Sequence, residues 1–167
     1  MARALGSYEG PLQEAIHRWK YRGILSLTSL FGEWMADALR RHWGGASPEL
    51  LIPVPLHTRR LRERGFNQAL LLAQNLSRRT GIPCDKRILR KEKSTLPQVN
   101  LSGAEREKGV RGAFKIAEKK DLRGTSILLL DDVYTTGATV NECSRVLMAG
   151  GAKKVDVLTL AHAVKRT

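Results

Sequence analysis

The sequence has few cysteines, few aromatic residues and no long apolar run, and these absences exclude several classes of protein. Only two cysteines are present, Cys84 and Cys143, and their spacing fits neither a zinc site nor a disulfide framework. No apolar stretch approaches the ~20 residues that a membrane-spanning helix needs, and the first residues hold no apolar segment of signal-peptide length. We therefore expect a cytoplasmic protein without a membrane partner, folded as a single domain over residues 1–167.

Acidic residues are also scarce compared with basic ones. The formal net charge is +13, and the segment from residue 57 to residue 123 holds 18 of the 29 Lys and Arg residues but 7 of the 16 Asp and Glu residues. Such an excess of positive charge attracts polyanions, among them multiply phosphorylated metabolites and nucleic acids. A basic surface with no dedicated partner has the same composition, so charge alone does not separate these three interpretations.

The spacing of hydrophobic residues predicts alternating helices and strands. Apolar residues recur at helical intervals over three segments, approximately 10–23, 27–44 and 67–80. Short apolar runs that are typical of strands occur at 50–54, 87–90, 113–116, 127–130 and 155–160. This alternation predicts an α/β fold in which helices flank a central, mostly parallel sheet. We interpret residues 1–45 as a helical lead-in and residues 48–163 as the binding core.

The most informative segment is 127–139, in which four apolar residues precede Asp131 and Asp132 and a small, hydroxyl-rich loop follows. A helical pattern begins directly after the loop, so a buried strand, a turn and a helix are predicted to meet there. Backbone N–H groups of such a turn can hold a phosphate, and carboxylates at a strand end accept hydrogen bonds from sugar hydroxyls. The segment predicts a ribose-5-phosphate site; the alternative is a strand ending in two solvated aspartates and an ordinary helix cap. The candidate phosphate-binding residues are Thr135, Thr136, Gly137, Ala138 and Thr139.

A second candidate segment, residues 53–68, places four arginines within six positions after a predicted strand. If that strand lies parallel to and beside the Asp131 strand, both segments reach the same edge of the sheet. Arginine side chains bind phosphate oxygens in bidentate pairs, which suits a pyrophosphate group. The alternative is a solvated basic loop followed by a helix that Asn67 caps. The candidate pyrophosphate-binding residues are Arg59, Arg60, Arg62 and Arg64.

The segment 127–139 resembles the signature of the phosphoribosyltransferases, which bind phosphoribosyl pyrophosphate (PRPP). This resemblance implies that Asp131 and Asp132 are the catalytic carboxylates, which contact the ribose 2′ and 3′ hydroxyls directly or through water and Mg²⁺. It implies that residues 135–139 hold the 5′-phosphate of PRPP. It also implies the type I phosphoribosyltransferase fold with an N-terminal helical segment or hood, and a homodimer.

Further motifs narrow the resemblance. In chain order the sequence contains Ile-Pro-Val-Pro-Leu-His (52–57), Arg-Gly-Phe-Asn-Gln (64–68), Leu-Arg-Lys (89–91), Thr-Leu-Pro-Gln (95–98), Leu-Ser (101–102), Arg106 and Gly-Ala-Phe (112–114). Together with the PRPP signature, these motifs are similar to the ComF family, the competence-protein-F-like phosphoribosyltransferases, over residues 8–162. Two features depart from the family pattern. No cysteine precedes Cys84, so the N-terminal zinc ribbon of many members is not represented, and Gly109 stands where the family usually has asparagine.

The resemblance implies a Mg²⁺-dependent phosphoribosyltransferase of nucleotide metabolism, which transfers phosphoribosyl from PRPP to a nucleobase or a related acceptor. Two alternatives stay open: a PRPP-binding protein without transferase activity, and a competence protein of DNA uptake that binds single-stranded DNA through the basic middle region. Stacking on aromatic rings is a usual part of single-strand binding, and only Phe66 and Phe114 lie in that region. The sequence does not identify the acceptor.

Overall fold

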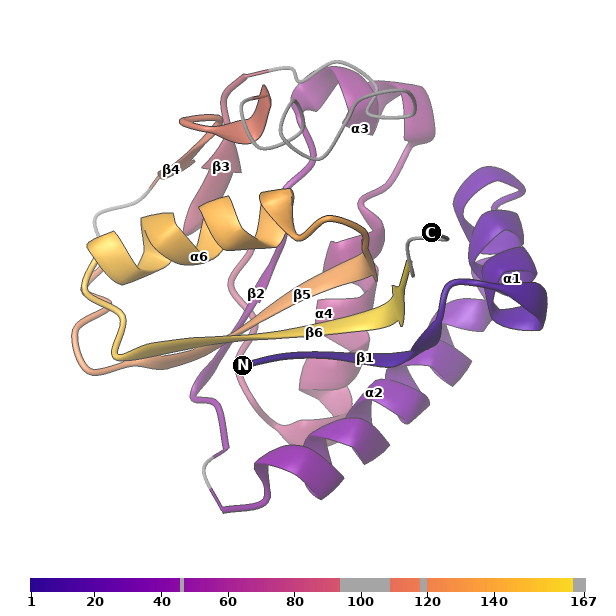
Figure 1. Ribbon diagram of the computed structural model, residues 1–167, viewed down its shortest axis with the longest axis horizontal. Coiled ribbons are helices and arrows are strands. Elements are labelled where there is room, and N and C mark those ends of the chain that lie inside the picture. Colours follow the sequence, from indigo (N-terminus) through magenta and orange to yellow (C-terminus); the bar gives the residue numbers. More distant parts are fainter. Residues whose placement is uncertain (46, 94–108, 118–119, 164–167) are drawn as a thin grey trace.

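Four parallel strands form the central sheet of the computed structural model, which describes residues 1–45, 47–93, 109–117 and 120–163. The strand order is β1-β6-β5-β2, and each neighbouring pair is parallel. The strands are β1 (Ala2–Ser7), β2 (Leu50–Pro53), β5 (Ser126–Tyr134) and β6 (Lys154–His162). The predicted α/β class with a mostly parallel sheet is confirmed (Figure 1).

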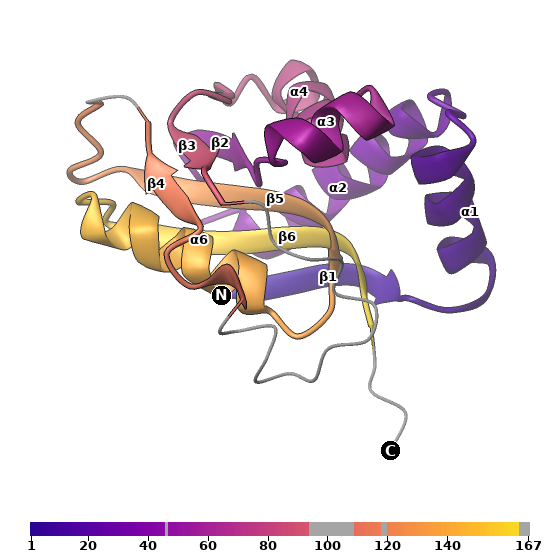
Figure 2. The ribbon, with the colours of Figure 1, turned by 90° about the horizontal axis from the view of Figure 1, so that it is seen from above.

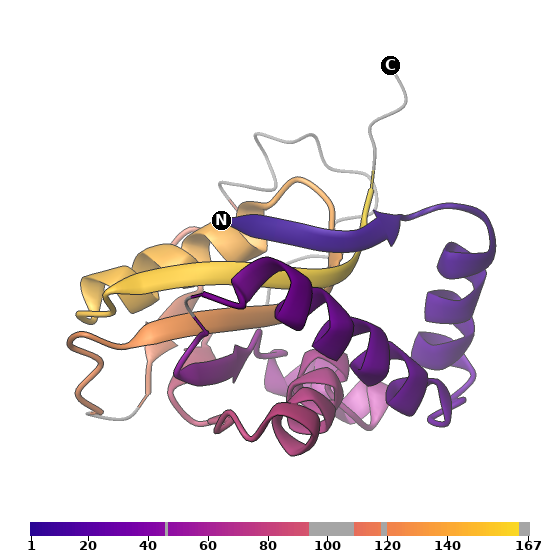
Figure 3. The ribbon, with the colours of Figure 1, turned by 90° about the horizontal axis from the view of Figure 1, so that it is seen from below.

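Helices α2 (Leu27–Trp43), α4 (Gln68–Thr80) and α6 (Ala138–Ala149) cover the two faces of this sheet. Helix α1 (Gly10–Tyr21) lies beyond the ends of the strands and packs against α2 (Figure 1). Helix α6 lies on one face, whereas α2 and α4 lie on the other (Figures 2 and 3). The helices predicted at 10–23, 27–44 and 67–80 are confirmed as α1, α2 and α4, and the helix predicted after the loop is confirmed as α6. Within the described part of the chain, no helix combines the length and the apolar character that crossing a membrane requires.

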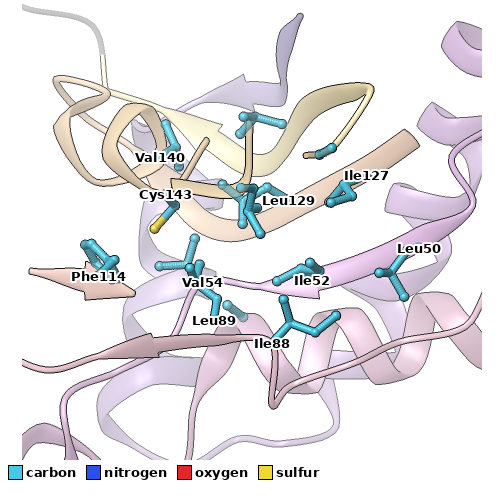
Figure 4. Packing of buried hydrophobic residues seen from close by; sticks show 14 of the residues in the cluster. Leu50, Ile52, Val54, Ile88, Leu89, Phe114, Ile127, Leu129, Val140 and Cys143 are labelled. Carbon is cyan, nitrogen blue, oxygen red and sulfur yellow. The ribbon is translucent and has the colours of Figure 1, made fainter. Parts of the chain in front are cut away.

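The sheet separates two apolar clusters, because successive side chains of a strand point to opposite faces. On β5, Ile127 and Leu129 belong to the cluster under α6, whereas Leu128 and Leu130 belong to the cluster under α2 and α4. Figure 4 shows the first cluster, in which Cys143 of α6 packs as a buried thiol. The unbroken apolar run of β5 is therefore explained by burial on both faces, as is typical of central strands in parallel sheets.

A separate two-stranded antiparallel ribbon is formed by β3 (Leu89–Lys91) and β4 (Phe114–Ile116). The sequence predicts strands at both places, and the structure keeps them out of the central sheet. Their buried side chains, Leu89 and Phe114, add to the cluster on the α6 side (Figure 4). The motif residues at 95–98, 101, 102 and 106 lie outside the described part of the chain.

The edge strand β1 is the main departure from the predicted organisation. Residues 1–45 are expected to be a helical lead-in, yet Ala2–Ser7 forms a strand that pairs with β6 in the register Ala4↔Thr159. The segment contains no β-branched residue and is at best partly buried, so neither composition nor alternation marks it as a strand. The helical part of the interpretation corresponds to α1 and α2.

Gly32 of α2 determines how closely α2 approaches α4. A Cβ at this position would overlap the side chain of Asn75, a nearly buried residue of α4. Asn75 Oδ1 also accepts a 2.8 Å hydrogen bond from Arg79 Nε, so the side chain cannot turn away without losing that bond. We expect Gly32→Ala to lower the free energy of unfolding in urea by about 1–3 kcal/mol. Gly45→Ala is the control, because a Cβ there meets no described atom within 4 Å; equal losses in both variants would contradict this account.

Candidate functional site

The carboxyl ends of β2 and β5 lie side by side at one edge of the sheet. Pro53 is in register with Leu130, and the N–H of Val54 continues the pairing by donating to the Leu130 carbonyl oxygen at 2.9 Å. The chain runs from β2 into the arginine segment, while β5 carries Asp131 and Asp132 immediately after Leu130. The two candidate segments thus meet at the same edge of the sheet, as the sequence predicts.

The two aspartates are partly buried and differ in their surroundings. Asp131 Oδ1 accepts the N–H of Asp132 at 2.9 Å, and Asp132 Oδ2 lies 2.7 Å from Lys20 Nζ. The pKa of Asp131 is raised to about 7, chiefly because burial disfavours the charged carboxylate and secondly because Asp132 lies beside it. The positive charges of Lys20 and Lys91 act in the opposite direction. The site therefore combines a carboxyl group that titrates near neutral pH with a carboxylate that is paired with an ammonium group.

The loop after β5 turns sharply into α6. Gly137 has a φ of 78°, in the left-handed region, and directly precedes the first residue of the helix. A Cβ at Gly137 would overlap the Tyr134 hydroxyl, so both the backbone conformation and the available space favour glycine. The first N–H groups of a helix lack intrahelical partners and lie at the positive end of its dipole. The turn can therefore accommodate an anion.

One cavity of about 190 Å³ brings the aspartates and the loop together. Its lining includes Asp131, Asp132, Lys20 and four of the five predicted loop residues, namely Thr135, Gly137, Ala138 and Thr139. Thr136 is not part of this lining. Its hydroxyl instead accepts the N–H of Ala138 at 3.4 Å, which stabilises the turn.

The arginine segment, for which the sequence predicts a loop, forms a short helix, α3 (Thr58–Arg64). At its start, His57 Nδ1 accepts the N–H of Arg59 at 3.2 Å. At its end, Gly65 adopts a left-handed conformation with a φ of 80°. None of the helix residues is buried. The helix therefore has no apolar face, and hydrophobic spacing carries no signal for it.

The helical conformation divides the four arginines between two directions, since residues four apart lie on the same side of a helix. Arg60 and Arg64 line a second cavity, of about 250 Å³, which also includes Lys20. Arg59 and Arg62 are exposed, and Arg59 forms a 3.1 Å ion pair with Glu63 on the same helix. The structure thus brings two of the four predicted pyrophosphate-binding residues to the site and leaves the other two on the surface.

The last two residues of the Arg-Gly-Phe-Asn-Gln motif, Asn67 and Gln68, fix the start of α4 and the position of Arg64. The Asn67 side chain caps α4, as predicted, and its Nδ2 donates to the Val54 carbonyl oxygen at 3.1 Å. Gln68 is almost fully buried, and its Oε1 accepts a 3.1 Å hydrogen bond from Arg64 Nη1. The guanidinium of Arg64 also lies over the Tyr21 ring, 5.3 Å from its centroid. Arg64 is therefore held in place by neutral groups.

Two lysines lie at the site although no sequence motif assigns them a role. Lys20 of α1 lines both cavities and pairs with Asp132. Lys91 of β3 lies close enough to Asp131 to lower its pKa, and burial lowers the pKa of Lys91 itself. Lys91 belongs to the Leu-Arg-Lys motif (89–91), and this is the signal by which it could have been identified. Lys20 lies only within the wider range, 8–162, over which the resemblance extends.

Comparison with solved structures identifies the class of fold. The chain matches a glutamine PRPP amidotransferase from B. subtilis with a TM-score of 0.53 and 22% identity, over 81% of this chain and 26% of that one. It matches a hypoxanthine phosphoribosyltransferase from Trypanosoma cruzi with a TM-score of 0.51 and 12% identity, over 83% of this chain and 65% of that one. At these identities the likeness shows the fold alone. The chain has the type I phosphoribosyltransferase fold.

Relatives in sequence narrow this class, although a scan against family models finds no match. The chain is 38% identical to competence protein F of Haemophilus influenzae over 164 residues, which are 95% of this chain and 71% of the relative. It is 32% identical to the DNA utilization protein YhgH of Escherichia coli K12, over 95% of this chain and 70% of the relative. The chain therefore belongs to the competence protein F (ComF) family.

The raised pKa of Asp131 predicts a pH-dependent stability of the ligand-free protein. A carboxyl group whose pKa is higher in the folded than in the unfolded state stabilises the fold while it is protonated, and this contribution is lost as the pH rises from 3.8 to about 7. The uncharged variant Asp131→Asn escapes this loss. We expect its stability relative to wild type to increase by about 1–3 kcal/mol between pH 5 and pH 8, measured by urea denaturation in Mg²⁺-free buffer.

Asp85→Asn is the matched control for this prediction. Burial raises the pKa of Asp85, but the N–H of Arg87 and the ammonium group of Lys120 outweigh burial and lower the pKa overall. Their hydrogen bonds to the carboxylate measure 2.9 and 3.0 Å. Asp85→Asn should therefore lose stability at pH 8, where Asp131→Asn gains it. A loss of stability at pH 8 in both variants would show that Asp131 is not a destabilising charge.

Proposed function

We propose that this edge of the sheet is a PRPP-binding site and that the protein is a Mg²⁺-dependent phosphoribosyltransferase. The observation that supports the proposal most strongly is the order of chemical groups along the two cavities: an anion-accommodating turn, two carboxyl groups and then a cluster of cations. PRPP carries complementary groups in the same order, namely a 5′-phosphate, two ribose hydroxyls and a pyrophosphate at C1′. Lys20, which lines both cavities, marks the boundary between them.

Each group of PRPP then has a chemically suited partner. Backbone N–H groups of residues 135–139 receive the 5′-phosphate at the start of α6. Asp131 and Asp132 accept hydrogen bonds from the ribose hydroxyls. Arg60 and Arg64 bind the pyrophosphate oxygens, whereas the exposed Arg59 and Arg62 contribute to the long-range field that attracts the anion.

The donor set of the site suits a Mg²⁺ ion that arrives with its phosphate ligand. Asp131 and Asp132 supply two adjacent carboxyl groups, and among the described residues no cluster of three or more His, Cys, Asp or Glu side chains could hold a metal by itself. Mg²⁺ usually keeps several waters and binds one or two carboxylates together with substrate phosphates. Asp131 and Asp132 would therefore hold the ion, directly or through water, and the ion would supply positive charge beside the pyrophosphate.

Transfer of the phosphoribosyl group breaks the bond between C1′ and the pyrophosphate oxygen and forms a bond between C1′ and the acceptor. Positive charge develops on the ribose ring, and negative charge develops on the leaving pyrophosphate. The carboxylates orient the ring and favour its positive charge, while Arg60 and Arg64 stabilise the leaving group. This chemistry requires no nucleophilic side chain. A nucleobase or a related compound is the proposed acceptor.

Asp131→Ala/Asp132→Ala tests the proposal directly. In isothermal titration, we expect wild type to bind PRPP in the presence of Mg²⁺ and to bind it at least about 10-fold more weakly without the ion, because charge-assisted contacts would be lost. The double variant should lose the Mg²⁺-dependent part of the binding. Incubation of the wild-type complex with a panel of nucleobases, followed by assay of released pyrophosphate, then tests for transferase activity.

The control for this titration is Asp121→Ala, which removes an exposed aspartate that pairs with Arg123. Its affinity for PRPP should equal that of wild type. Folded wild-type protein that does not bind Mg²⁺-PRPP would contradict the proposal. Binding without release of pyrophosphate for any acceptor would instead favour a PRPP-binding protein that is not a transferase.

A second candidate function is the binding of single-stranded DNA, which the names of the relatives favour. These names refer to competence and to DNA utilization, and the net charge of +13 also favours a polyanion. Of the two aromatic residues in the basic middle region, however, Phe114 is buried and Phe66 is partly buried. Stacking of bases in that region is therefore limited, and contact with DNA would depend on backbone charge.

Salt dependence distinguishes this second function. If the basic surface binds single strands through phosphates alone, the affinity for oligo-dT should fall steeply with salt concentration and should be the same in wild type and in Asp131→Ala/Asp132→Ala. Fluorescence anisotropy of a labelled oligonucleotide measures both effects. Absence of binding at low salt would rule out DNA as a direct ligand of this chain.

A further inference from the structure

Lys20 joins the two cavities of the site. Its Nζ lies 2.7 Å from Asp132 Oδ2, and the two side chains are only 14% and 15% exposed. Lys20 lines the cavity that contains the aspartates, and it also lines the cavity that contains Arg60 and Arg64. A single ammonium group is therefore adjacent to both the carboxylate end and the guanidinium end of the site.

The end of α1 holds Lys20 at this position. The preceding residue, Trp19, is fully buried, and its Nε1 donates to Thr28 Oγ1 of α2 at 2.9 Å. The following residue, Tyr21, packs under the guanidinium of Arg64. The last turn of α1 is thus anchored by Trp19 before Lys20 and contacts Arg64 through the exposed Tyr21 ring after it, and it faces α3 across the second cavity.

The ion pair between Lys20 and Asp132 occupies Oδ2 of the carboxylate, so it has to open if a ribose hydroxyl or Mg²⁺ takes that oxygen. A largely buried ammonium group that loses its partner is costly unless another anion replaces it. The second cavity is lined by Arg60, Arg64 and one carboxylate, Glu63, which is already paired with Arg59. In the first cavity the other carboxyl group is Asp131, which the proposed function assigns to the same ribose. The replacement anion is therefore expected to come from the ligand, and a pyrophosphate meets this requirement.

We propose that Lys20 is a pyrophosphate-binding residue that exchanges Asp132 for the pyrophosphate when PRPP binds. This inference rests on the proposed function of the site and assigns a residue and an exchange of partners within it. Lysine suits this role because its compact ammonium group has three donors and sits on a flexible stem, so it can turn between neighbouring partners. Arg64, which Gln68 and Tyr21 hold in place, provides the fixed part of the same anion-binding end.

If Lys20 has only a structural role, its loss should affect the binding of different ligands in a different way. If the ion pair only fastens α1 to β5, its loss should disturb the position of Asp132 and weaken every ligand that contains ribose. If Lys20 binds pyrophosphate, its loss should weaken PRPP and spare ribose 5-phosphate, which has no pyrophosphate. The two ligands therefore separate the two roles.

The test compares Lys20→Met with wild type by isothermal titration of PRPP and of ribose 5-phosphate, both with Mg²⁺. We expect the Kd for PRPP to rise about 10- to 100-fold, the size of one lost charge-assisted contact, and the Kd for ribose 5-phosphate to change by less than about threefold. Lys20→Arg keeps the charge and should recover part of the affinity for PRPP. Arg18→Met is the control, because Arg18 is exposed on the same helix and pairs with Glu14.

Equal losses for both ligands in Lys20→Met, or an unchanged Kd for PRPP, would overturn the role of Lys20 while the wild-type titration still supports the proposed function. Wild-type protein that binds neither ligand would overturn both. Circular dichroism establishes that each variant is folded before titration. If Lys20→Met is unfolded, Asp132→Asn with inorganic pyrophosphate in Mg²⁺-free buffer decides the matter, because no metal then links Asp132 to the ligand. An affinity equal to or higher than that of wild type supports the exchange, and a lower affinity overturns it.

Discussion

The pairing of β2 with β5 is the constraint on which the geometry of the site depends. The strand β2 is short, yet all of its residues are buried, and Ile52 and Pro53 lie in register with Leu129 and Leu130. A shift of one residue would turn these apolar side chains to the wrong faces, so core packing fixes the register. The register in turn fixes where the arginine segment begins relative to Asp131. The burial that stabilises the centre of the sheet is therefore the same interaction that brings the carboxyl groups and the guanidinium groups to one edge.

The charge distribution then differs between the two ends of the site at this edge of the sheet. At one end the negative charge is suppressed, because the pKa of Asp131 is raised to about 7 and Asp132 is paired with Lys20. At the other end, Arg64 is held by the amide of Gln68 and the ring of Tyr21, and neither of these groups cancels its charge. A ligand whose hydroxyl groups lie beside the aspartates and whose concentrated negative charge lies beside Arg64 would complement this arrangement.

The elements that could be predicted from the sequence are those whose evidence is local. The apolar run before Asp131 predicts a central strand, and the small residues after it predict a tight turn, which Gly137 supplies with its positive φ. Strand β1 could not be predicted because its support comes from β6, at the opposite end of the chain. Helix α3 could not be predicted because it has no buried residue and hence no apolar period. The position of Lys20 depends on how α1 docks against the sheet, and no local pattern contains that information.

The chain has a phosphoribosyltransferase fold, yet its relatives are named for competence and DNA utilization. The arginines of α3, which point in two directions, suggest how one protein could serve both a small ligand and DNA. Arg60 and Arg64 line a cavity of about 250 Å³, which is suited to a small anion and too small for a polynucleotide. Arg59 and Arg62 are exposed, where a longer phosphate backbone would meet them. Because helical spacing separates these pairs, one short helix can present cations both to a metabolite within the site and to a polyanion on the surface. The two proposed functions therefore place no conflicting demand on the same side chains.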